Sequence, residues 1–483
     1  MAQLIKKIRT ERGYYVYDTW TNEILEVDRS IFHLLPDSAP VVAVDDLQTA
    51  TEQGPAMEAI ESARKDGYFR ADFPVVSSFP ESLMDQTIHS LLERGPDHVI
   101  LNITERCNLR CRYCSFSGAY DDNRTHSSEV MSAEVIDAAL RWYFGFRGRS
   151  EFSLGFYGGE PLTDLSLLKD AVEAAKRLAP GSLKLRLTTN ATMLTEEVCR
   201  FLIQHDFRLN VSLDGPREVH DRYRVFPDGR GSFEAAWEGV MRQYRMDPGL
   251  FGARVTFNVV GAAPIRLREI ASFMAENPDI FQDHSVTVSR VNPYPSCLSD
   301  DILAMETDPS YPSQKAELFG LFRDKMLTGR VFPEDFALSF FKSDFMDAHQ
   351  RVMSDMKETT PSNGQCVPGD PKCFVSTRGD LYMCERVGSS RPIGSVGKGF
   401  DTGTIVQIMR DYDAAFKERC AHCWAIRFCS KCFVTVRHGD DFSENRIEAF
   451  CRATRNRWHW VLQHYCEIRE SREDAFGWCS EIA

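Results

Sequence analysis

The sequence predicts an α/β fold in which the middle of the chain is built on a parallel sheet. Between residue 96 and about residue 300, six apolar, β-prone runs alternate with amphipathic helical segments, the pattern of parallel strands joined by crossover helices. The chain has 483 residues, more than one hydrophobic core usually holds, so several domains are expected. Its 15 cysteines are clustered, near residue 110 and after residue 365.

Residues 1–90 are expected to form an N-terminal domain. Two β-prone runs, 14–18 and 23–27, flank a short polar link and predict a hairpin. Short helices are expected over 30–35 and 56–66. A hairpin with small helices resembles the winged-helix-like recognition domain that binds the leader of a precursor peptide by adding a strand to its sheet. The alternative is a subdomain that only packs on the rest of the protein.

A linker over 73–80 and a helix over 81–93 lead to the predicted sheet. Helices within the sheet region begin at capping residues, Ser132 and Thr195 among them. The expected strands are residues 99–103, 152–157, 183–187, 207–213, 254–260 and 285–289.

Three thiols follow the first of these strands at C-x3-C-x2-C spacing: Cys107, Cys111 and Cys114. Three thiolates on one loop can hold three irons of a four-iron cluster and leave the fourth iron without a protein ligand, whereas closed clusters take four cysteines. An open metal position is a place for chemistry. The alternatives are a structural zinc site or three unrelated core thiols.

This spacing, with Tyr113 before the last cysteine, resembles the radical S-adenosylmethionine (SAM) enzymes. The resemblance implies a partial (β/α)6 radical SAM barrel over residues 96–330. It implies that the open iron binds SAM, which is cleaved reductively to a 5′-deoxyadenosyl radical. Active residues are then expected at the carboxyl ends of the strands.

Polar motifs do follow these strand ends, and the resemblance assigns them to SAM. Gly158, Glu160 and the glycine between them would meet its amino group, although a plain turn would look the same. That glycine is Gly159. Asn190 would contact the ribose. Ser212 and Arg224 are assigned to the carboxylate or ribose, and Asn258 to the adenosine. For Asn258 the alternative is a hydrogen bond at the strand edge, and for Asp214 and His220 it is a capped turn.

After a connecting segment, 331–365, residues 366–455 carry a second field of cysteines. Eight of them suffice for two fully ligated four-iron clusters. The spacing resembles the SPASM domain of peptide-modifying radical SAM enzymes, except for two rather than three residues before Cys432. The resemblance implies that one cluster takes Cys366, Cys373, Cys384 and Cys432, and the other takes Cys420, Cys423, Cys429 and Cys451. Two structural zinc sites are the alternative.

Glu385 follows Cys384. In relatives an acidic residue at this place can act as a base, and the alternative is a solvated glutamate; Arg386 is its expected partner. Residues 456–483 are expected to be a closing helix and tail. Cys466 and Cys479 lie outside the pattern, and the isolated Cys199 and Cys297 are assigned to core or loop.

Composition excludes some classes of protein. The net charge of −13 argues against a general nucleic-acid binder. No apolar run is long enough to span a bilayer, and the first residues lack the apolar core of a secretion signal. A cytoplasmic location is expected, where cysteines serve as metal ligands or redox thiols.

Together the motifs predict a radical SAM/SPASM enzyme that modifies a ribosomally made peptide, forming an intramolecular thioether or C–C cross-link. It would carry three [4Fe–4S] clusters, one binding SAM and two auxiliary ones that accept an electron or orient a substrate thiolate. Its partners would be a precursor peptide, held by its leader at the N-terminal domain, and an electron donor such as flavodoxin or ferredoxin. Alternatives are sulfatase-maturase-like formation of formylglycine, peptide epimerisation or excision, and a zinc-binding interaction scaffold.

Overall fold

The computed structural model describes residues 3–36, 50–80, 82–120, 123–281, 286–291, 308–329, 336–362, 366–387 and 391–480. Cys297 and the first residue of the expected strand 285–289 lie outside these ranges. Within them, no helix is both long enough and apolar enough to cross a membrane.

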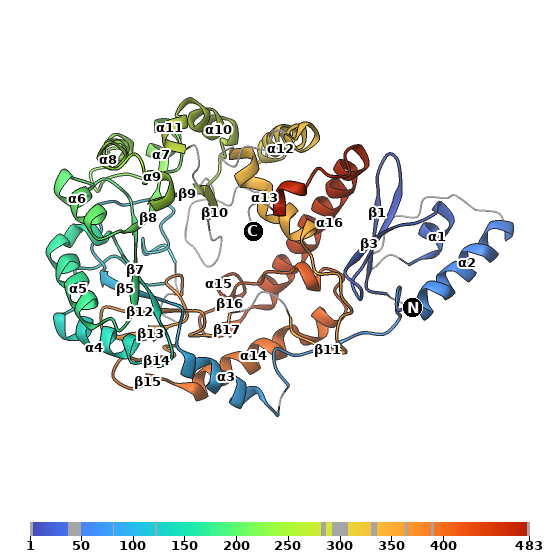
Figure 1. Ribbon diagram of the computed structural model, residues 1–483, viewed down its shortest axis with the longest axis horizontal. Helices are drawn as coiled ribbons and strands as arrows, with labels where there is room; N and C mark the ends of the chain where they lie inside the picture. The colour runs from blue at the N-terminus through green and yellow to red at the C-terminus, as the bar shows by residue number, and fades with distance from the viewer. Residues whose placement is uncertain are drawn as a thin grey trace.

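Six parallel strands form the centre of the molecule, one for each run expected from the sequence. They pair in chain order, without crossovers between distant strands. They are β5 (His98–Thr104), β6 (Glu151–Gly158), β7 (Ser182–Thr189), β8 (Arg208–Ser212), β9 (Val255–Gly261) and β10 (Val286–Arg290). Figure 1 shows them along the inner side of an arc of helices.

The helices of this arc cover one face of the sheet. On the helix that follows β5, the buried residues Ile136, Ala139, Leu140, Tyr143 and Phe144 form the face that the sequence predicts, and the side chain of Ser132 caps its first turn. The crossover helices are α4 (Ala133–Phe144), α5 (Leu165–Leu178), α6 (Glu196–Gln204), α7 (Arg217–Tyr223), α8 (Phe233–Met246), α9 (Phe251–Arg254), α10 (Leu267–Glu276) and α11 (Pro278–Phe281).

The C-terminal region continues the same sheet. Strand β12 (Lys372–Val375) pairs in parallel with β5, and β13 (Asp380–Tyr382), β14 (Gly394–Ser395) and β15 (Gly399–Phe400) follow as antiparallel neighbours. The result is a mixed sheet of ten strands. Cys373, on β12, therefore lies beside β5, the strand that precedes the first cysteine loop.

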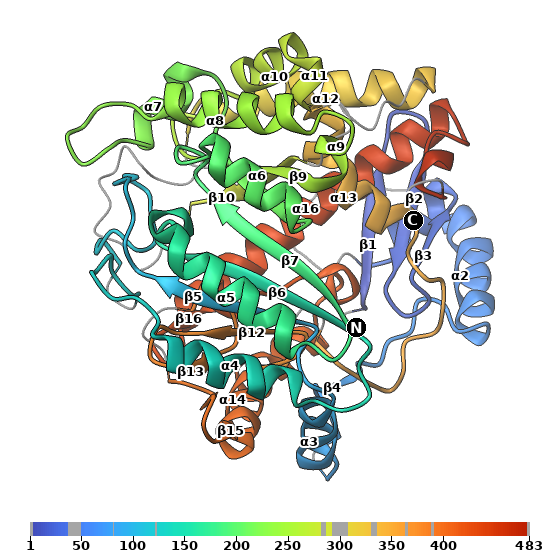
Figure 2. The ribbon, with the colours of Figure 1, turned by 60° about the vertical axis from the view of Figure 1, so that its left-hand side comes forward.

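Helices of the C-terminal half lie across the open side of the arc (Figures 1 and 2). The segment expected to be only a connection, 331–365, contains a helix, α13. The proposed boundary at residue 455 falls inside one continuous helix, α16. These elements are α12 (Tyr311–Thr328), α13 (Phe336–His349), α14 (Thr402–Ala421), α15 (Phe433–Val436), the hairpin β16 (Arg437–His438) and β17 (Asp441–Phe442), and α16 (Glu444–Ser471).

The N-terminal region is a three-stranded antiparallel sheet with two helices. Strands β2 (Tyr14–Asp18) and β3 (Glu23–Glu26) form the expected hairpin, and β1 (Ile5–Arg9), which the sequence analysis did not predict, pairs with β2. Helices α1 (Arg29–Leu34) and α2 (Ala50–Lys65) follow. Val16 of β2 faces a small core shared with α1 and α2, and Tyr17 faces the main core. The sheet is thus packed on both faces.

The expected linker before the sheet region is itself structured. It contains β4 (Val75–Val76), which pairs in parallel with β11 (Thr359–Thr360). Helix α3 (Met84–Arg94) then leads to β5. A strand of two residues depends on a partner nearly 300 positions away, so the composition of the linker alone did not indicate it.

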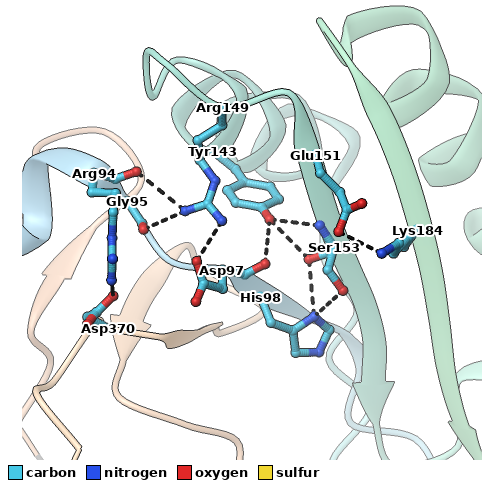
Figure 3. Close-up of polar contacts among 10 residues, drawn as sticks. All are labelled: Arg94, Gly95, Asp97, His98, Tyr143, Arg149, Glu151, Ser153, Lys184 and Asp370. Carbon is cyan, nitrogen blue, oxygen red and sulfur yellow. Dashed lines mark hydrogen bonds and ion pairs between the residues drawn. The ribbon is translucent and has the colours of Figure 1, made fainter. Parts of the chain in front are cut away.

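A polar network closes the amino end of the sheet (Figure 3). The guanidinium of Arg149 lies 2.7 Å from the Asp97 carboxylate and donates to the Gly95 carbonyl at 2.8 Å. The Tyr143 hydroxyl accepts a hydrogen bond from the Ser153 amide at 3.0 Å. These contacts join the starts of β5 and β6 to α4, at the end of the strands opposite to the cysteine loop.

Candidate active site

The first cysteine loop is fixed by backbone contacts with a distant segment. It follows the carboxyl end of β5, and the amides of Arg110 and Arg112 donate to the carbonyls of Val225 at 2.7 Å and Tyr223 at 2.9 Å. The Cys114 amide donates to the Cys111 carbonyl at 3.0 Å, which closes a tight turn. The loop therefore takes its shape from the region after α7 as well as from its own sequence.

The thiols of Cys107, Cys111 and Cys114 lie together beneath the surface and form no disulfide. Burial, with smaller contributions from the charges of Cys114 and Cys107, raises the pKa of Cys111 to about 12. Amide groups point at two of the sulfurs, from Leu109 to Cys107 and from Phe116 to Cys114, each at 3.4 Å. Burial alone disfavours the thiolate form of these cysteines, whereas the nearby amide donors favour it. Both features fit a site in which a bound metal cluster stabilises the thiolates.

Gly158 and Gly159 lock the end of β6 against the start of this loop. The Gly159 amide donates to the Thr104 carbonyl at 2.8 Å, and the Glu160 amide donates to the Arg106 carbonyl at 2.8 Å. A Cβ atom on Gly159 would lie 2.2 Å from the Arg106 oxygen, and one on Gly158, which has φ of +150°, would lie 2.0 Å from the Thr104 oxygen. Only glycine fits at this distance of approach.

The carboxylate of Glu160 is held by the ends of two strands. It is 1% exposed and accepts hydrogen bonds from the Asn190 amide at 2.7 Å, the Thr189 hydroxyl at 2.9 Å and the Leu162 amide at 3.1 Å. Burial raises its pKa to about 7, against these hydrogen bonds. Glu160 thus positions the end of β7 relative to β6, whatever it also contacts in a ligand.

Asn190 connects β7 to the cysteine loop. Its amide nitrogen donates to the Asn108 side chain at 2.9 Å, and its oxygen accepts from the Thr192 hydroxyl at 2.6 Å. Asn108 in turn donates to Thr192 at 2.8 Å. The side chain predicted to meet a ribose is therefore built into the wall of the loop itself.

Arg224 forms a buried ion pair with Asp214, with 3.0 Å between Nε and Oδ2. Tyr113 donates its hydroxyl to the same carboxylate oxygen, and the Val260 amide donates to the other oxygen at 3.0 Å. The charge of Arg224 lowers the pKa of the buried Cys111. The arginine expected to bind a carboxylate of SAM already has a carboxylate partner, and it lies beside the first thiol group.

His220 belongs to a turn rather than to an exposed site. Its Nδ1 accepts from the Asp214 amide at 3.4 Å, which leaves the proton on Nε2, 3.0 Å from the Ser232 hydroxyl. That hydroxyl donates to the Arg224 carbonyl at 2.8 Å. Burial lowers the pKa of His220 to about 3, so it is neutral at physiological pH. The contacts of His220 are those of a hydrogen-bonded turn, which was the alternative to a direct role.

Ser212, at the end of β8, lies opposite Asn258, in the middle of β9, in the parallel register. Both are partly exposed. The Asn258 side-chain oxygen accepts from the Ser289 hydroxyl on β10 at 2.6 Å. The sheet thus brings these two predicted SAM contacts side by side, and Asn258 also makes the strand-to-strand hydrogen bond that was its alternative reading.

The eight C-terminal cysteines fall into two groups. Burial, and then the neighbouring Cys432, raises the pKa of Cys366. Burial raises the pKa of Cys384 to about 12, with smaller contributions from Glu385 and Cys432, and Cys384 raises that of the buried Cys373. In the other group, burial raises the pKa of Cys429 to about 12, and its charged neighbours there are Cys420, Cys423 and Cys451. The neighbours within each group are thiols that the resemblance assigns to the same cluster, and the binding of a cluster by either group stays a prediction.

Glu385 lies next to the first of these groups with its side chain 15% exposed. Its partner is Lys372, at 3.3 Å, and not Arg386 as expected. Lys372 lies on β12, which pairs with β5. Because the approach of β12 to β5 is set by the sheet, sequence proximity selected the wrong basic residue.

Two buried cations near the thiols were missed in the sequence analysis. The guanidinium of Arg124 lies between the rings of Phe116, at 4.0 Å, and Phe374, at 4.4 Å, and its two terminal nitrogens have no hydrogen-bond partner among the described residues. Lys431 donates to Cys420 at 3.6 Å and Cys429 at 3.9 Å. In the sequence, the position of Lys431 between Cys429 and Cys432 was the only feature that could have indicated its place beside the thiols.

Cys199, Cys466 and Cys479 are buried in the main core, which agrees with their place outside the motifs. Across the ranges that the structure describes, no group of three or more His, Cys, Asp or Glu side chains is arranged to hold a single metal ion. A four-iron cluster is a larger body, and its ligands are farther apart.

A protein-family model described as the radical SAM superfamily matches residues 101–259. Among curated proteins, the chain is 34% identical over 139 residues to a serine-type anaerobic sulfatase-maturating enzyme of Bacteroides thetaiotaomicron, an alignment that covers 28% of this chain and 33% of that enzyme. It is 24% identical over 149 residues to a cysteine-type anaerobic sulfatase-maturating enzyme of Clostridium novyi, covering 30% of this chain and 40% of the relative. The chain therefore matches less than half the length of these relatives.

The fold extends further than the sequence similarity. The solved structure of native anSMEcpe with bound AdoMet superimposes with a TM-score of 0.58 at 17% identity, covering 79% of this chain and 99% of that one. A radical SAM domain implies a [4Fe–4S] cluster and SAM, and the first thiol group has the residues that such a cluster requires. Residues 101–259 of this chain form a radical SAM domain, homologous to the corresponding part of the anaerobic sulfatase-maturating enzymes.

Proposed function

We propose that the protein is a radical SAM enzyme that modifies a ribosomally made peptide, forming a thioether or C–C cross-link within it. The observation that carries the proposal is that the C-terminal region is built onto the strand before the first cysteine loop: β12, which holds Cys373, pairs with β5, and Arg124 lies between the rings of Phe116, just after that loop, and Phe374 on β12. A substrate between this loop and the C-terminal region would meet the site of radical chemistry and an acidic residue, Glu385, at the same time. The solved structure of native anSMEcpe with AdoMet and the Cp18Cys peptide has the same fold, with a TM-score of 0.56, which supports a peptide substrate.

When bound, the cluster of the first thiol group and SAM would supply a 5′-deoxyadenosyl radical that removes a hydrogen atom from the substrate. The side chains near SAM would be those of Ser212, Arg224 and Asn258. The backbone of Gly158 and Gly159 and the carboxylate of Glu160 would line the place of its amino group. A cross-link removes two hydrogen atoms from the peptide. One would go to the 5′-deoxyadenosyl radical, and the other would leave as a proton, accepted by Glu385, and an electron, accepted by an auxiliary cluster.

The two C-terminal thiol groups would hold the auxiliary clusters, in the grouping described above. The N-terminal sheet would hold the leader of the peptide. Among the described residues its strand β3 pairs with β2 alone, and the leader would add a strand at the other edge of β3. A flavodoxin or ferredoxin is the proposed electron donor, and the cytoplasm the proposed location.

The test is made on anaerobically reconstituted protein. We expect about twelve irons per chain, the stoichiometry of three four-iron clusters, and release of 5′-deoxyadenosine from SAM on reduction with dithionite. Alanine at Cys107, Cys111 and Cys114 removes that release, while alanine at the buried core residue Cys199 retains it. Bound zinc without sulfide, or full 5′-deoxyadenosine release from the triple variant, contradicts the proposal.

A second function, oxidation of a cysteine or serine to formylglycine, is supported by the similarity to serine- and cysteine-type sulfatase-maturating enzymes. The two products differ chemically. Formylglycine is an aldehyde and reacts with a hydrazide probe, whereas a cross-linked peptide does not and resists sequencing between the joined residues. Mass spectrometry of a sulfatase-derived peptide and of a candidate precursor, each incubated with the same enzyme, separates the two functions.

A further inference from the structure

The second C-terminal thiol group, which we call the Cys420 group (Cys420, Cys423, Cys429 and Cys451), encloses a lysine. Lys431 is 1% exposed. Its ammonium donates to the sulfurs of Cys420 at 3.6 Å and Cys429 at 3.9 Å. No carboxylate of the described residues pairs with it, so its positive charge is directed at the thiols.

Aromatic rings enclose the same ammonium. It lies 5.1 Å from the centre of the Phe416 ring and 6.0 Å from that of Tyr412. Both rings are buried, and an interior of this kind screens a charge far less than water does. The electric field of Lys431 on its neighbours is therefore screened less than that of a lysine in water.

The direction of the effect follows from this geometry. An ammonium that donates to the sulfurs of two of the four ligands favours negative charge on them, and so favours the addition of an electron to whatever these ligands share.

The other C-terminal group, that of Cys366, Cys373, Cys384 and Cys432, has a different environment. Its lysine neighbour Lys372 has a side chain that is 41% exposed and paired with Glu385 at 3.3 Å. A paired, exposed cation contributes little net field. Among the described residues, only the Cys420 group has an ammonium that donates to its sulfurs.

We propose that Lys431 raises the reduction potential of the cluster bound by the Cys420 group, and so makes this auxiliary site the easier one to reduce. The inference rests on the proposed function, because it requires a cluster at that group. Charge and hydrogen bonds at cluster sulfurs are known determinants of such potentials. The change concerns a single electron, which in a titration is supplied by dithionite and taken up by the oxidised cluster.

The experiment is a potentiometric titration of the anaerobically reconstituted full-length protein, followed by electron paramagnetic resonance. The signal that belongs to the Cys420 group is the one lost in Cys429→Ala. In Lys431→Met we expect the equilibrium constant for its one-electron reduction to fall at least tenfold, a midpoint lower by about 59 mV or more. Lys431→Arg keeps the charge and is expected to restore the wild-type midpoint. Lys372→Met is the matched control and leaves this midpoint in place.

The inference is overturned if the midpoint of the Cys420-group signal is unchanged in Lys431→Met. It is also overturned if Lys431→Arg lowers this midpoint as much as Lys431→Met does. Lys431→Gln is the second neutral variant, for use if the methionine variant loses iron. Loss of iron from both neutral variants but not from Lys431→Arg assigns the lysine to holding the cluster and not to tuning it, which also contradicts the inference. If wild-type protein binds no cluster at the Cys420 group, iron and sulfide analysis shows that the proposed function has failed, and not the inference alone.

Discussion

Single side chains in this site mostly hold other side chains. Arg224 is paired with Asp214 and His220 with Ser232, and the Glu160 carboxylate accepts three hydrogen bonds from its own chain. Buried polar groups need such partners, because an unpaired one is costly. The residues that match the ligand-binding motifs of the family therefore also carry structural roles, and their substitution will affect stability as well as chemistry.

Glu160 gives a pH dependence with a definite sign. Burial raises its pKa from 4.5 to about 7, so the folded protein binds a proton that the unfolded chain releases. The contribution of Glu160 to the free energy of unfolding is fully present below about pH 4.5. It is lost as the pH rises to about 7, by up to about 3 kcal/mol. Urea unfolding of wild type and Glu160→Gln at pH 5 and pH 7.5 measures it. The loss between the two pH values should be smaller in the variant, and an equal loss in both contradicts the assignment.

His220 acts in the opposite direction. Burial lowers its pKa to about 3, so the unfolded chain binds the proton first, and stability is lost as the pH falls from about 6.5 towards 3. His220→Phe fills the space but leaves Asp214 and Ser232 without their partner, at a cost of about 2–3 kcal/mol at neutral pH. The variant should lose less stability on acidification than wild type. A variant as stable as wild type at pH 7 would show that the hydrogen-bond chain contributes nothing.

At the scale of elements, the two ends of the parallel strands have different roles. The carboxyl ends of β5 and β6 are joined by the Gly158 and Gly159 backbone contacts next to the cysteine loop. The amino ends are joined by the network around Arg149 (Figure 3). In α/β barrels the first end carries chemistry and the second stability, which separates the effects of substitutions at each.

Gly159→Ala tests the carboxyl end. The new Cβ would lie 2.2 Å from the Arg106 oxygen, so the strand end or the loop must move, at a cost of about 1–3 kcal/mol. We expect reduced iron content and reduced 5′-deoxyadenosine release. Gly397→Ala is the control, because no atom lies within 4 Å of its added Cβ. Wild-type iron content in Gly159→Ala would show that the loop tolerates the displacement.

Arg149→Ala tests the amino end. It removes the contacts with Asp97 and the Gly95 carbonyl, and we expect a loss of about 1–2 kcal/mol in the free energy of unfolding. Iron content and 5′-deoxyadenosine release per folded molecule should match wild type, because the network lies at the far end of the strands. Loss of iron at full stability would contradict this separation.

At the scale of the whole molecule, the N-terminal sheet and the C-terminal region are packed against each other. Tyr17 contacts the Phe428 ring at 5.0 Å between centroids, and the Thr19 hydroxyl donates to the Trp424 carbonyl at 2.8 Å. Arg427 lies at the centre of this interface. A leader bound to the N-terminal sheet would therefore sit on a unit fixed to the cluster-binding region, not on a loose appendage.

Arg427→Ala tests this docking. Its guanidinium donates to the carbonyls of Ser354 at 2.7 Å and Trp20 at 3.1 Å. The variant removes both hydrogen bonds, although the Trp20 carbonyl keeps the one from the Met356 amide. We expect faster proteolysis in the segment between the N-terminal sheet and α3, and a loss of about 1–3 kcal/mol in stability. Arg410→Ala, which removes an exposed pair with Asp85, serves as the control. Equal proteolysis of both variants would show that Arg427 does not hold the interface.

The sequence by itself determined the positions of the six parallel strands, the helices capped by Ser132 and Thr195, and the spacing of the first cysteine loop. These features repeat over short stretches, so periodicity and capping are sufficient to predict them. The hairpin near the N-terminus was predicted for the same reason. Its third strand, β1, was missed because its alternation is short and its partner decides it.

Only the tertiary structure decided which distant groups meet. It placed β12 against β5, Lys372 rather than Arg386 against Glu385, and Asp214 against the arginine expected to bind a ligand. It also directed Lys431 at two thiols. Such contacts join segments far apart in the chain, or depend on how a short loop turns, and no local pattern in the sequence records the distance or the direction of approach.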